Sequence, residues 1–276
     1  MRGGIRFVHI ALPIGKASLA GIPLGRQAVI RGLYTAATGM MVQRNKMDTL
    51  TNNLVNAETT GYKKETLVSS TFTEVMLDRL SDSGDNGIGS YAYGNRVDQQ
   101  YIDFSQGSLE ETGKATDLAI IGDGFFVVQT AAGDRYTRAG NFAVDGEGYL
   151  VNGDGCYVLG RQGRIQAGGA DFIVQADGAV LVDGAAVDTL RIETFTDLNV
   201  LRKQGDNLYY GYGDAAAVNA TGFQVSQGVQ ENSNMDVVSG MVELLTLYRK
   251  YEANQKVVTM TNETLSMAVN LGKLGG

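Results

Sequence analysis

The sequence predicts a mainly β middle domain of many short strands, inserted between long N- and C-terminal α-helices that pair as a coiled-coil-like stalk. Three observations predict this architecture. Apolar residues follow a heptad pattern near the N-terminal end, a second heptad pattern lies near the C-terminal end, and short β-prone runs alternate with Asp-Gly and Asn-Gly turns between them. The chain has 276 residues with 37 Gly and 2 Pro, a balance that fits many tight turns.

The N-terminal pattern extends over residues 31–57, which contain no proline. Apolar residues recur every seven positions, and a companion line is interrupted only by Gln43. The two lines are Leu33, Met40, Met47 and Leu54, and Ala36, Leu50 and Ala57. Gly61 follows as a stop signal, so the pattern predicts an axial helix over residues 29–61.

The C-terminal pattern predicts a second axial helix over residues 229–276, with Ser233 or Asn234 as its N-terminal cap. One apolar line contains Val237, Leu244, Tyr251, Val258 and Leu265, and the other contains Met241, Tyr248 and Val269. Large residues on the two helices define the expected assembly interface: Leu33, Met40, Met47, Leu50, Leu54, Val237, Met241, Leu244, Tyr248, Tyr251, Val258 and Leu265. Met and aromatic side chains suit such a contact, but they suit an ordinary core equally well.

The region between the helices divides in two. Residues 62–94 are polar and rich in Gly, Ser, Asp and Asn toward their end, which predicts a linker or loop region. Residues 95–228 contain runs such as Phe125–Gln129, and turn signals such as Asp145-Gly146 and Asp177-Gly178, and predict the β-rich domain. Helices at opposite ends of the sequence either meet and pack with further copies, or lie flat on the β domain of a monomer; the pattern leaves both open.

Composition argues against several classes of function. The net charge is −7 and no basic cluster exceeds Lys63-Lys64, so nucleic-acid binding is not expected. Cys156 is the single cysteine and His9 the single histidine, so metal sites and His-based catalysis lack their usual residues. Gly122-Asp-Gly124 precedes a β-prone run and predicts a turn, because a dinucleotide site needs a third glycine and a helix. We therefore expect no enzyme activity, no catalytic residues, no cofactor and no metal.

Several separated motifs resemble the bacterial flagellar rod and hook proteins. Residues 30–40 (IRGLYTAATGM) are similar to the start of these proteins, and residues 52–63 (NNLVNAETTGYK) are similar to their N-x-x-T-x-G-[FY]-[KR] signature. Further matches follow in the middle and at the closing motif, over residues 30–271 in all. The signature residues are Asn56, Thr59, Gly61, Tyr62, Gly122, Gly124, Phe125, Phe126, Tyr136, Arg138, Gly140, Asn141, Ser233, Asn234, Arg249, Tyr251 and Glu252.

This resemblance implies a structural subunit of the flagellar basal-body rod, proximal or distal, that self-assembles through its terminal helices into a tube transmitting torque from motor to hook. It implies partners among other copies of the chain, other rod and hook subunits and the flagellar type III export apparatus, with no membrane insertion and an extracytoplasmic place in the basal body. A hook or hook-associated component is the alternative. A secreted β-rich adhesin or glycosidase is the alternative of another class.

The first 28 residues differ from the rest. Their apolar run is interrupted by Lys16 and by both prolines of the chain, Pro13 and Pro23. Two interpretations are open: a weak secretory signal, or upstream DNA translated from a start codon chosen too early. The rod and hook proteins typically begin at the residue before Ile30, and this residue is Val29, whose GTG codon can start translation. The resemblance therefore predicts that residues 1–28 are a non-native extension.

Overall fold

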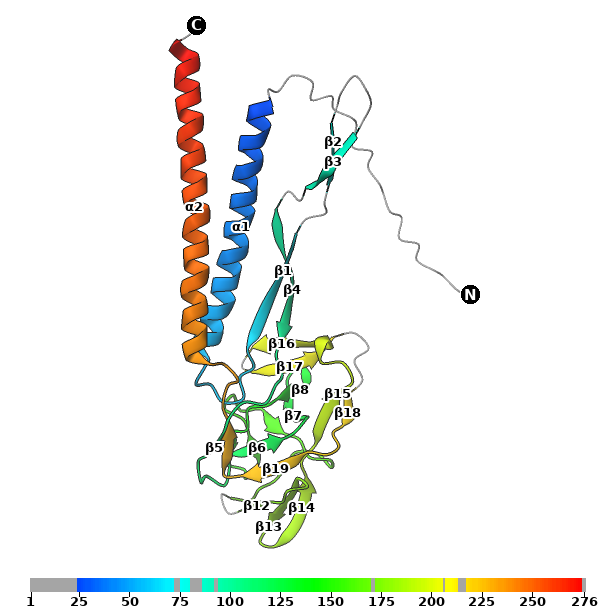
Figure 1. Ribbon diagram of the computed structural model, residues 1–276. Helices are drawn as coiled ribbons and strands as arrows, with labels where there is room; N and C mark the ends of the chain where they lie inside the picture. Colours follow the sequence, from blue (N-terminus) through cyan, green and yellow to red (C-terminus); the bar gives the residue numbers. More distant parts are fainter. Residues whose placement is uncertain are drawn as a thin grey trace, which may run out of the picture.

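The chain folds into a β domain with two helices standing at one end (Figure 1). The computed structural model describes residues 24–71, 75–79, 86–91, 94–169, 172–205, 207–212 and 217–274. Helix α1 spans Leu24–Val55 and helix α2 spans Val237–Leu274, and the two lie side by side and antiparallel. None of the described helices combines the length and apolar character needed to cross a membrane.

The β domain is a set of small antiparallel sheets around one nine-stranded sheet with the main path β16-β17-β8-β7-β11-β10-β9. Strand β15 joins it by pairing with both β7 and β18. Its strands are β7 (Phe125–Thr130), β8 (Gly133–Thr137), β9 (Ala143–Val144), β10 (Leu150–Val151), β11 (Tyr157–Val158), β15 (Ile192–Phe195), β16 (Leu201–Gly205), β17 (Leu208–Gly211) and β18 (Ala217–Asn219). A short 3-10 helix, η1 (Leu198–Val200), leads into β16.

Smaller sheets cover the lower part of the domain and connect it to the helices. One has the order β12-β13-β14, and the others are the pairs β19-β6 and β20-β5. Their strands are β5 (Leu109–Glu111), β6 (Leu118–Ile121), β12 (Phe172–Val174), β13 (Ala179–Val182), β14 (Ala185–Thr189), β19 (Gln224–Gln227) and β20 (Val229–Glu231). In Figure 1, β13 and β14 lie at the end of the domain away from the helices.

The predicted coiled-coil-like stalk of two long paired helices is wrong. α1 is the shorter helix, and the two are close beside the β domain but farther apart toward their free ends (Figure 1), whereas coiled-coil partners keep an even separation. Burial decreases in the same direction: Leu50 and Leu247 are buried near the β domain, and Leu265 is only half-buried farther out. Periodicity shows that residues share a helix face, but not which neighbour covers that face.

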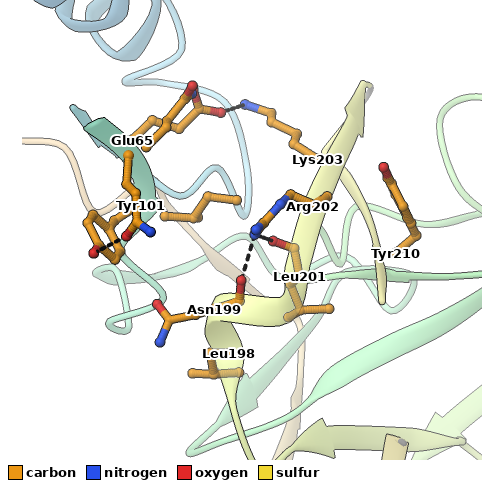
Figure 2. A pocket seen from close by; sticks show the side chains of 11 residues that line it. Glu65, Tyr101, Leu198, Asn199, Leu201, Arg202, Lys203 and Tyr210 are labelled. Carbon is orange, nitrogen blue, oxygen red and sulfur yellow. Dashed lines mark hydrogen bonds and ion pairs between the residues drawn. The ribbon is translucent and has the colours of Figure 1, made fainter. Parts of the chain in front are cut away.

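The region expected as a linker, residues 62–94, instead contains strands. β1 (Glu65–Thr71) pairs with β4 (Asn95–Ile102), and β2 (Val75–Arg79) pairs with β3 (Asn86–Tyr91), so that two ribbons form an arm beside α1. The β1–β4 ribbon is largely exposed, and for that reason its strands carry polar side chains that resemble a loop sequence. At the base of the arm a cavity of about 500 Å³ lies between β1, β4, η1, β16 and β17 (Figure 2).

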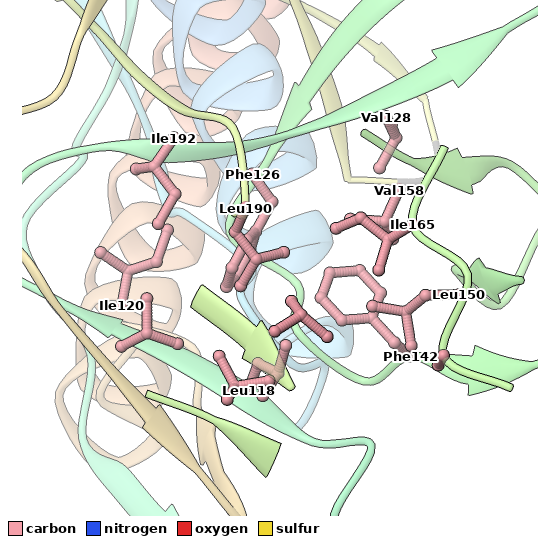
Figure 3. Close-up of a cluster of buried hydrophobic side chains, with 14 of the residues drawn as sticks. Leu118, Ile120, Phe126, Val128, Phe142, Leu150, Val158, Ile165, Leu190 and Ile192 are labelled. Carbon is pink, nitrogen blue, oxygen red and sulfur yellow. The ribbon is translucent and has the colours of Figure 1, made fainter. Parts of the chain in front are cut away.

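The β domain is stabilised by two apolar clusters on opposite faces of β7. Phe126 and Val128 belong to the larger cluster, with Leu118, Ile165 and Leu190 among its fully buried members (Figure 3). Phe125 points into the second cluster with Phe195, Leu201 and Tyr209. A central strand covered on both faces has a continuous apolar sequence, and Phe125-Phe-Val-Val is such a run.

The ends of α2 and α1 differ from the predicted boundaries. α2 begins at Val237, after strand β20, and its cap is Asp236, whose carboxylate accepts a hydrogen bond from the Val238 amide at 3.0 Å. Asn234, one of the two expected caps, bonds to residues of the arm base instead. α1 begins at Leu24, before Val29, while residues 1–23 lie outside the described part of the chain. The proposed non-native extension of residues 1–28 stays a prediction.

Candidate functional site

Three signature segments far apart in the sequence meet at a junction between the helices and the β domain. The junction comprises the turn Gly61–Lys63 after α1, Arg138 after β8, and Glu231 at the end of β20. The Gly61 amide donates to the Glu231 carbonyl at 2.6 Å. Gly61 has a φ of 65°, and a Cβ there would lie 2.3 Å from the Ala139 backbone nitrogen, so only glycine allows this approach.

A buried ionic cluster occupies the centre of the junction. Glu231 accepts from Lys63 Nζ at 2.6 Å and from Arg138 Nη1 at 3.3 Å, and the exposed fractions of these three side chains are 0%, 0% and 4%. Burial lowers the pKa of Lys63 and of Arg138, and the Glu231 carboxylate opposes both shifts. Two cations around one carboxylate leave a buried net positive charge.

Backbone groups complete the coordination of this cluster. Lys63 Nζ also donates to the Ser105 carbonyl at 2.7 Å, and Arg138 Nη2 donates to the Gly122 carbonyl at 2.7 Å. The Gly107 amide donates at 2.9 Å to Glu231 Oε1, the oxygen that also accepts from Lys63. A Cβ on Gly107 would lie 1.9 Å from the Asn232 carbonyl oxygen, which explains the glycine. The cluster therefore joins five separate segments of the chain.

A second set of hydrogen bonds ties the last turns of α1 to the base of the arm. Asn53 is buried; its Oδ1 accepts from the Tyr62 hydroxyl at 3.0 Å and from the Glu65 amide at 2.9 Å. Its Nδ2 donates to the Glu65 carbonyl at 2.7 Å. Lys203 Nζ lies 4.0 Å from the centre of the Tyr62 ring, a cation–π contact. Burial, with a smaller effect of the Glu65 charge, raises the pKa of Tyr62 to about 12.

Asn234 extends the junction to the start of α2. Its Oδ1 accepts from the Lys64 amide at 2.8 Å, and its Nδ2 donates to the carbonyls of Asp103 and Ser105 at 2.8 and 3.2 Å. Both helices and the arm are thus held to the β domain by polar contacts at one place. These contacts fix the direction in which the helices leave the domain.

The face of α2 that meets α1 uses small and polar residues as well as large ones. A Cβ on Gly240 would lie 3.6 Å from Leu54 Cδ1 and 3.9 Å from Leu50 Cδ1, and a Cβ on Gly39 would lie 3.0 Å from Asn254 Nδ2. One line of buried or half-buried residues on α2 consists of Gly240, Leu247, Asn254 and Thr261, at seven-residue spacing. The expected interface residues Leu244, Tyr251, Val258 and Leu265 are half-buried beside it.

The other half of the expected α2 interface lies on an exposed face. Val237, Met241 and Tyr248 are exposed, at 37%, 56% and 52%. On α1, Leu50 is buried and Leu33, Met40, Met47 and Leu54 are half-buried. We call the exposed apolar residues of α2 the outer face: Val237, Val238, Met241, Val242, Leu245, Tyr248, Val257, Met260, Met267, Val269 and Leu271.

The structure brings together only part of the predicted signature. Asn56, Thr59, Gly61, Tyr62, Arg138, Ser233 and Asn234 lie at or next to the junction, and Asn56 and Asn141 both line a polar cavity of about 470 Å³ beside it. Gly122, Gly124, Phe125, Phe126, Tyr136 and Gly140 position strands and core side chains of the β domain. The remaining signature residues lie on α2, away from the junction: Arg249, Tyr251 and Glu252.

Sequence reasoning did not select Lys63, Glu231, Gly107 or Asn53 as site residues. A charged residue in a sequence is ordinarily expected at the surface, so no periodicity marks a buried ion pair. In the described part of the chain no group of three or more His, Cys, Asp or Glu residues is arranged to hold a metal ion.

The two helices are joined to the β domain by a fixed junction, and α2 exposes many apolar side chains. These features are typical of a subunit of a larger assembly. Three family matches agree with this interpretation. Residues 33–63 match "Flagella basal body rod protein", residues 119–188 match the "Flagellar hook protein FlgE/F/G D1 domain", and residues 226–271 match "Flagellar basal body rod FlgEFG protein C-terminal". These matches contain the three segments that meet at the junction.

The chain matches curated relatives over nearly the whole length of each relative. The chain is 33% identical over 267 residues to the flagellar basal-body rod protein FlgG of Bacillus subtilis (88% of this chain, 99% of the relative). It is 34% identical over 252 residues to the flagellar basal-body rod protein FlgF of Caulobacter vibrioides (88% and 98%), and 31% identical over 271 residues to the flagellar hook-basal body complex protein FlhO of B. subtilis (89% and 100%). The chain belongs to the flagellar basal-body rod protein family. This confirms the predicted family, the structural role and the place in the flagellar basal body.

Proposed function

We propose that this rod-family subunit assembles through the outer face of α2, which packs against helices of neighbouring subunits to build a tube that transmits torque from motor to hook. The observation that carries the proposal is the number of large apolar side chains exposed on one helix: eleven in the described part of α2. A soluble monomer rarely leaves so many large apolar side chains of one helix uncovered.

The junction gives this assembly its mechanical coupling. Torque applied to the helices must reach the β domain, and the buried Lys63–Glu231–Arg138 cluster is one of the contacts that join them. Membership of the family implies that the subunit assembles with other rod and hook subunits. We infer that neighbouring copies of the same chain are partners as well. Family membership also supports passage through the flagellar export apparatus. The subunit acts by assembly and not by catalysis.

A place in the hook or at the hook base is the second candidate. It is favoured by the match of residues 119–188 to a domain described for hook as well as rod proteins, and by the likeness to FlhO. Immunogold labelling of isolated hook–basal bodies separates the two positions. Label below the hook supports the rod, and label along or at the tip of the hook supports the alternative.

The assembly proposal is tested by charges on the outer face. Met241→Glu and Leu245→Glu replace exposed side chains, so the circular dichroism spectrum of the purified chain should equal that of wild type. Motility and incorporation into basal bodies should be lost, because a charge cannot be buried unpaired in a helix contact. Lys250→Glu, at an exposed polar position of the same helix, is the control. Normal swimming by both outer-face variants would refute the proposal.

A further inference from the structure

The two ends of the β domain carry surfaces of opposite character. At the end away from the helices, β13 and β14 are joined by the turn Val182–Ala185, which we call the tip (Figure 1). Val182 pairs with Ala185, and Asp183 and Gly184 between them have φ values of 52° and 82°. Two residues with positive φ form the stiff hairpin turn that matches strand twist, so the tip presents the Asp183 side chain in a defined position.

The tip belongs to an acidic segment with an apolar outer side. Residues 165–190 contain Asp171, Asp177, Asp183 and Asp188 and neither lysine nor arginine. Asp183 is exposed and makes no hydrogen bond or ion pair with any residue that the structure describes. On the outer side of the same small sheet, Ile173 is 63% and Val187 41% exposed.

The cavity at the arm base lies on the helix side of the domain, and its basic lining is complementary to the acidic tip. Its wall contains Arg202 and Lys203 of β16 together with the apolar surfaces of Tyr101 and Leu198 (Figure 2). Lys203 is paired with Glu65 at 3.3 Å. Arg202 is exposed and donates only to the backbone carbonyls of Asn199 and Leu201, at 2.6 and 3.0 Å. Among the described residues no carboxylate compensates its charge.

We propose that the tip of one copy inserts into the arm-base cavity of another copy, with Asp183 pairing with Arg202 and Ile173 covering Leu198 and Tyr101. The proposal rests on the proposed function, since it names a contact between subunits of the assembly. A cavity of about 500 Å³ is of the size that holds a small ligand or a short turn. The occupant is a second copy because the same chain supplies both the acidic tip and the uncompensated guanidinium.

Such a contact joins opposite ends of the β domain (Figure 1). It is heterologous, so it leaves a free tip and a free cavity at the two ends of every chain of copies. Because the tip and the cavity lie at opposite ends of the domain, we expect the contact to give an open chain of copies and not a closed ring. It would stack β domains independently of the helix packing at the outer face of α2.

Cysteine cross-linking in isolated basal bodies tests the contact, with the full chain in a Cys156→Ser background. The Asp183→Cys/Arg202→Cys double variant should give disulfide-linked dimers and longer ladders under mild oxidation, because every copy carries both positions. The control Glu147→Cys/Arg202→Cys uses an exposed acidic position in the β9–β10 turn. A ladder with the first pair only supports the contact. No ladder, or an equal ladder with the control, overturns it.

Charge reversal provides a second test that does not depend on oxidation. Asp183→Arg and Arg202→Asp should each reduce assembly about tenfold or more, since each places like charges together. The Asp183→Arg/Arg202→Asp double variant should recover wild-type assembly, and Glu147→Arg should not change it. Full assembly of both single variants would overturn the contact. Absence of the wild-type chain from basal bodies would instead overturn the proposed function, so the two failures are distinguishable.

Discussion

Glu231, the last residue of β20, and Lys63, which follows the end of α1, form an ion pair of 2.6 Å in which neither side chain is exposed. The pair joins segments separated by 168 positions in the sequence. Since Arg138 of the β domain shares the same carboxylate, a single side chain holds the N-terminal helix, the approach to the C-terminal helix and the β sheet together.

Replacing this carboxylate should weaken the fold strongly. Glu231→Gln leaves Lys63 and Arg138 buried without a counter-charge, and breaking a buried pair in this way costs about 3–5 kcal/mol. Urea unfolding followed by circular dichroism should show a correspondingly lower free energy of unfolding. Asp48→Asn, which breaks the exposed pair of Arg44 and Asp48 on α1, should cost less than about 0.5 kcal/mol. Equal stability of the two variants would show that the buried cluster contributes nothing.

The close approach at Gly61 gives a prediction with a matched control. Gly61 and Gly113 have φ values of 65° and 69°, but a Cβ on Gly113 meets nothing within 4 Å, whereas one on Gly61 meets the Ala139 backbone. Gly113→Ala should cost only the left-handed conformation, about 1–2 kcal/mol. Gly61→Ala should cost about 3 kcal/mol or more, because a backbone segment must move. Similar melting temperatures for the two variants would contradict this steric account.

The α2 contacts show how far periodicity could be used. The predicted line through Leu244 and Tyr251 is a half-buried row, whereas Met241 and Tyr248 of the predicted companion line are exposed. The helix instead meets α1 through Gly240, which allows close approach, and through Asn254. α2 has apolar residues on more than one side, and a pattern cannot say which side is covered within one chain.

The β domain could be predicted better than the junction. Short apolar runs with Asp-Gly and Asn-Gly turns mark strands directly, because turn geometry and strand pairing are local. The sites of Lys63 and Glu231 depend on contacts between distant segments, and a charged residue gives no local signal of burial. The arm was missed for a related reason: its strands are exposed, so they carry the polar composition of a loop.

An apolar replacement of Gln43 is expected to stabilise the fold. Its Oε1 atom is buried without a hydrogen-bond partner, and Gln43 lies on the same heptad line of α1 as Leu50. Gln43→Met keeps the unbranched shape and removes the unpaired acceptor, which should raise stability by about 1 kcal/mol. Thermal unfolding of the full chain measures this. Gln255→Met, at an exposed position of α2, is the control and should have little effect; a lower melting temperature for Gln43→Met would show that the oxygen has a partner in solution.

Alkaline pH should destabilise the fold through its tyrosines. Burial raises the pKa of Tyr62 and of Tyr136 to about 12 from the ordinary 10, and raises that of Tyr209 as well. Between these values the folded chain binds more protons than the unfolded chain, so the stability is fully present below about pH 10 and decreases as the pH rises toward about 12. The lowered pKa of Lys63 acts in the opposite direction below its ordinary value of 10.5 and partly offsets the start of this decrease.

The decrease can be assigned to the junction by comparing slopes. Urea unfolding of wild type at intervals between about pH 9 and about pH 12 should give a falling free energy of unfolding. Tyr62→Phe removes one titrating group and should make the fall shallower, although it also lowers the stability at every pH by removing the hydrogen bond to Asn53. Tyr212→Phe, at a side chain that is 67% exposed, should keep the wild-type slope. If Tyr62→Phe keeps that slope too, the Tyr62 hydroxyl does not remain protonated in the folded chain, and the hydrogen bonds that order the arm base are weaker than the structure indicates.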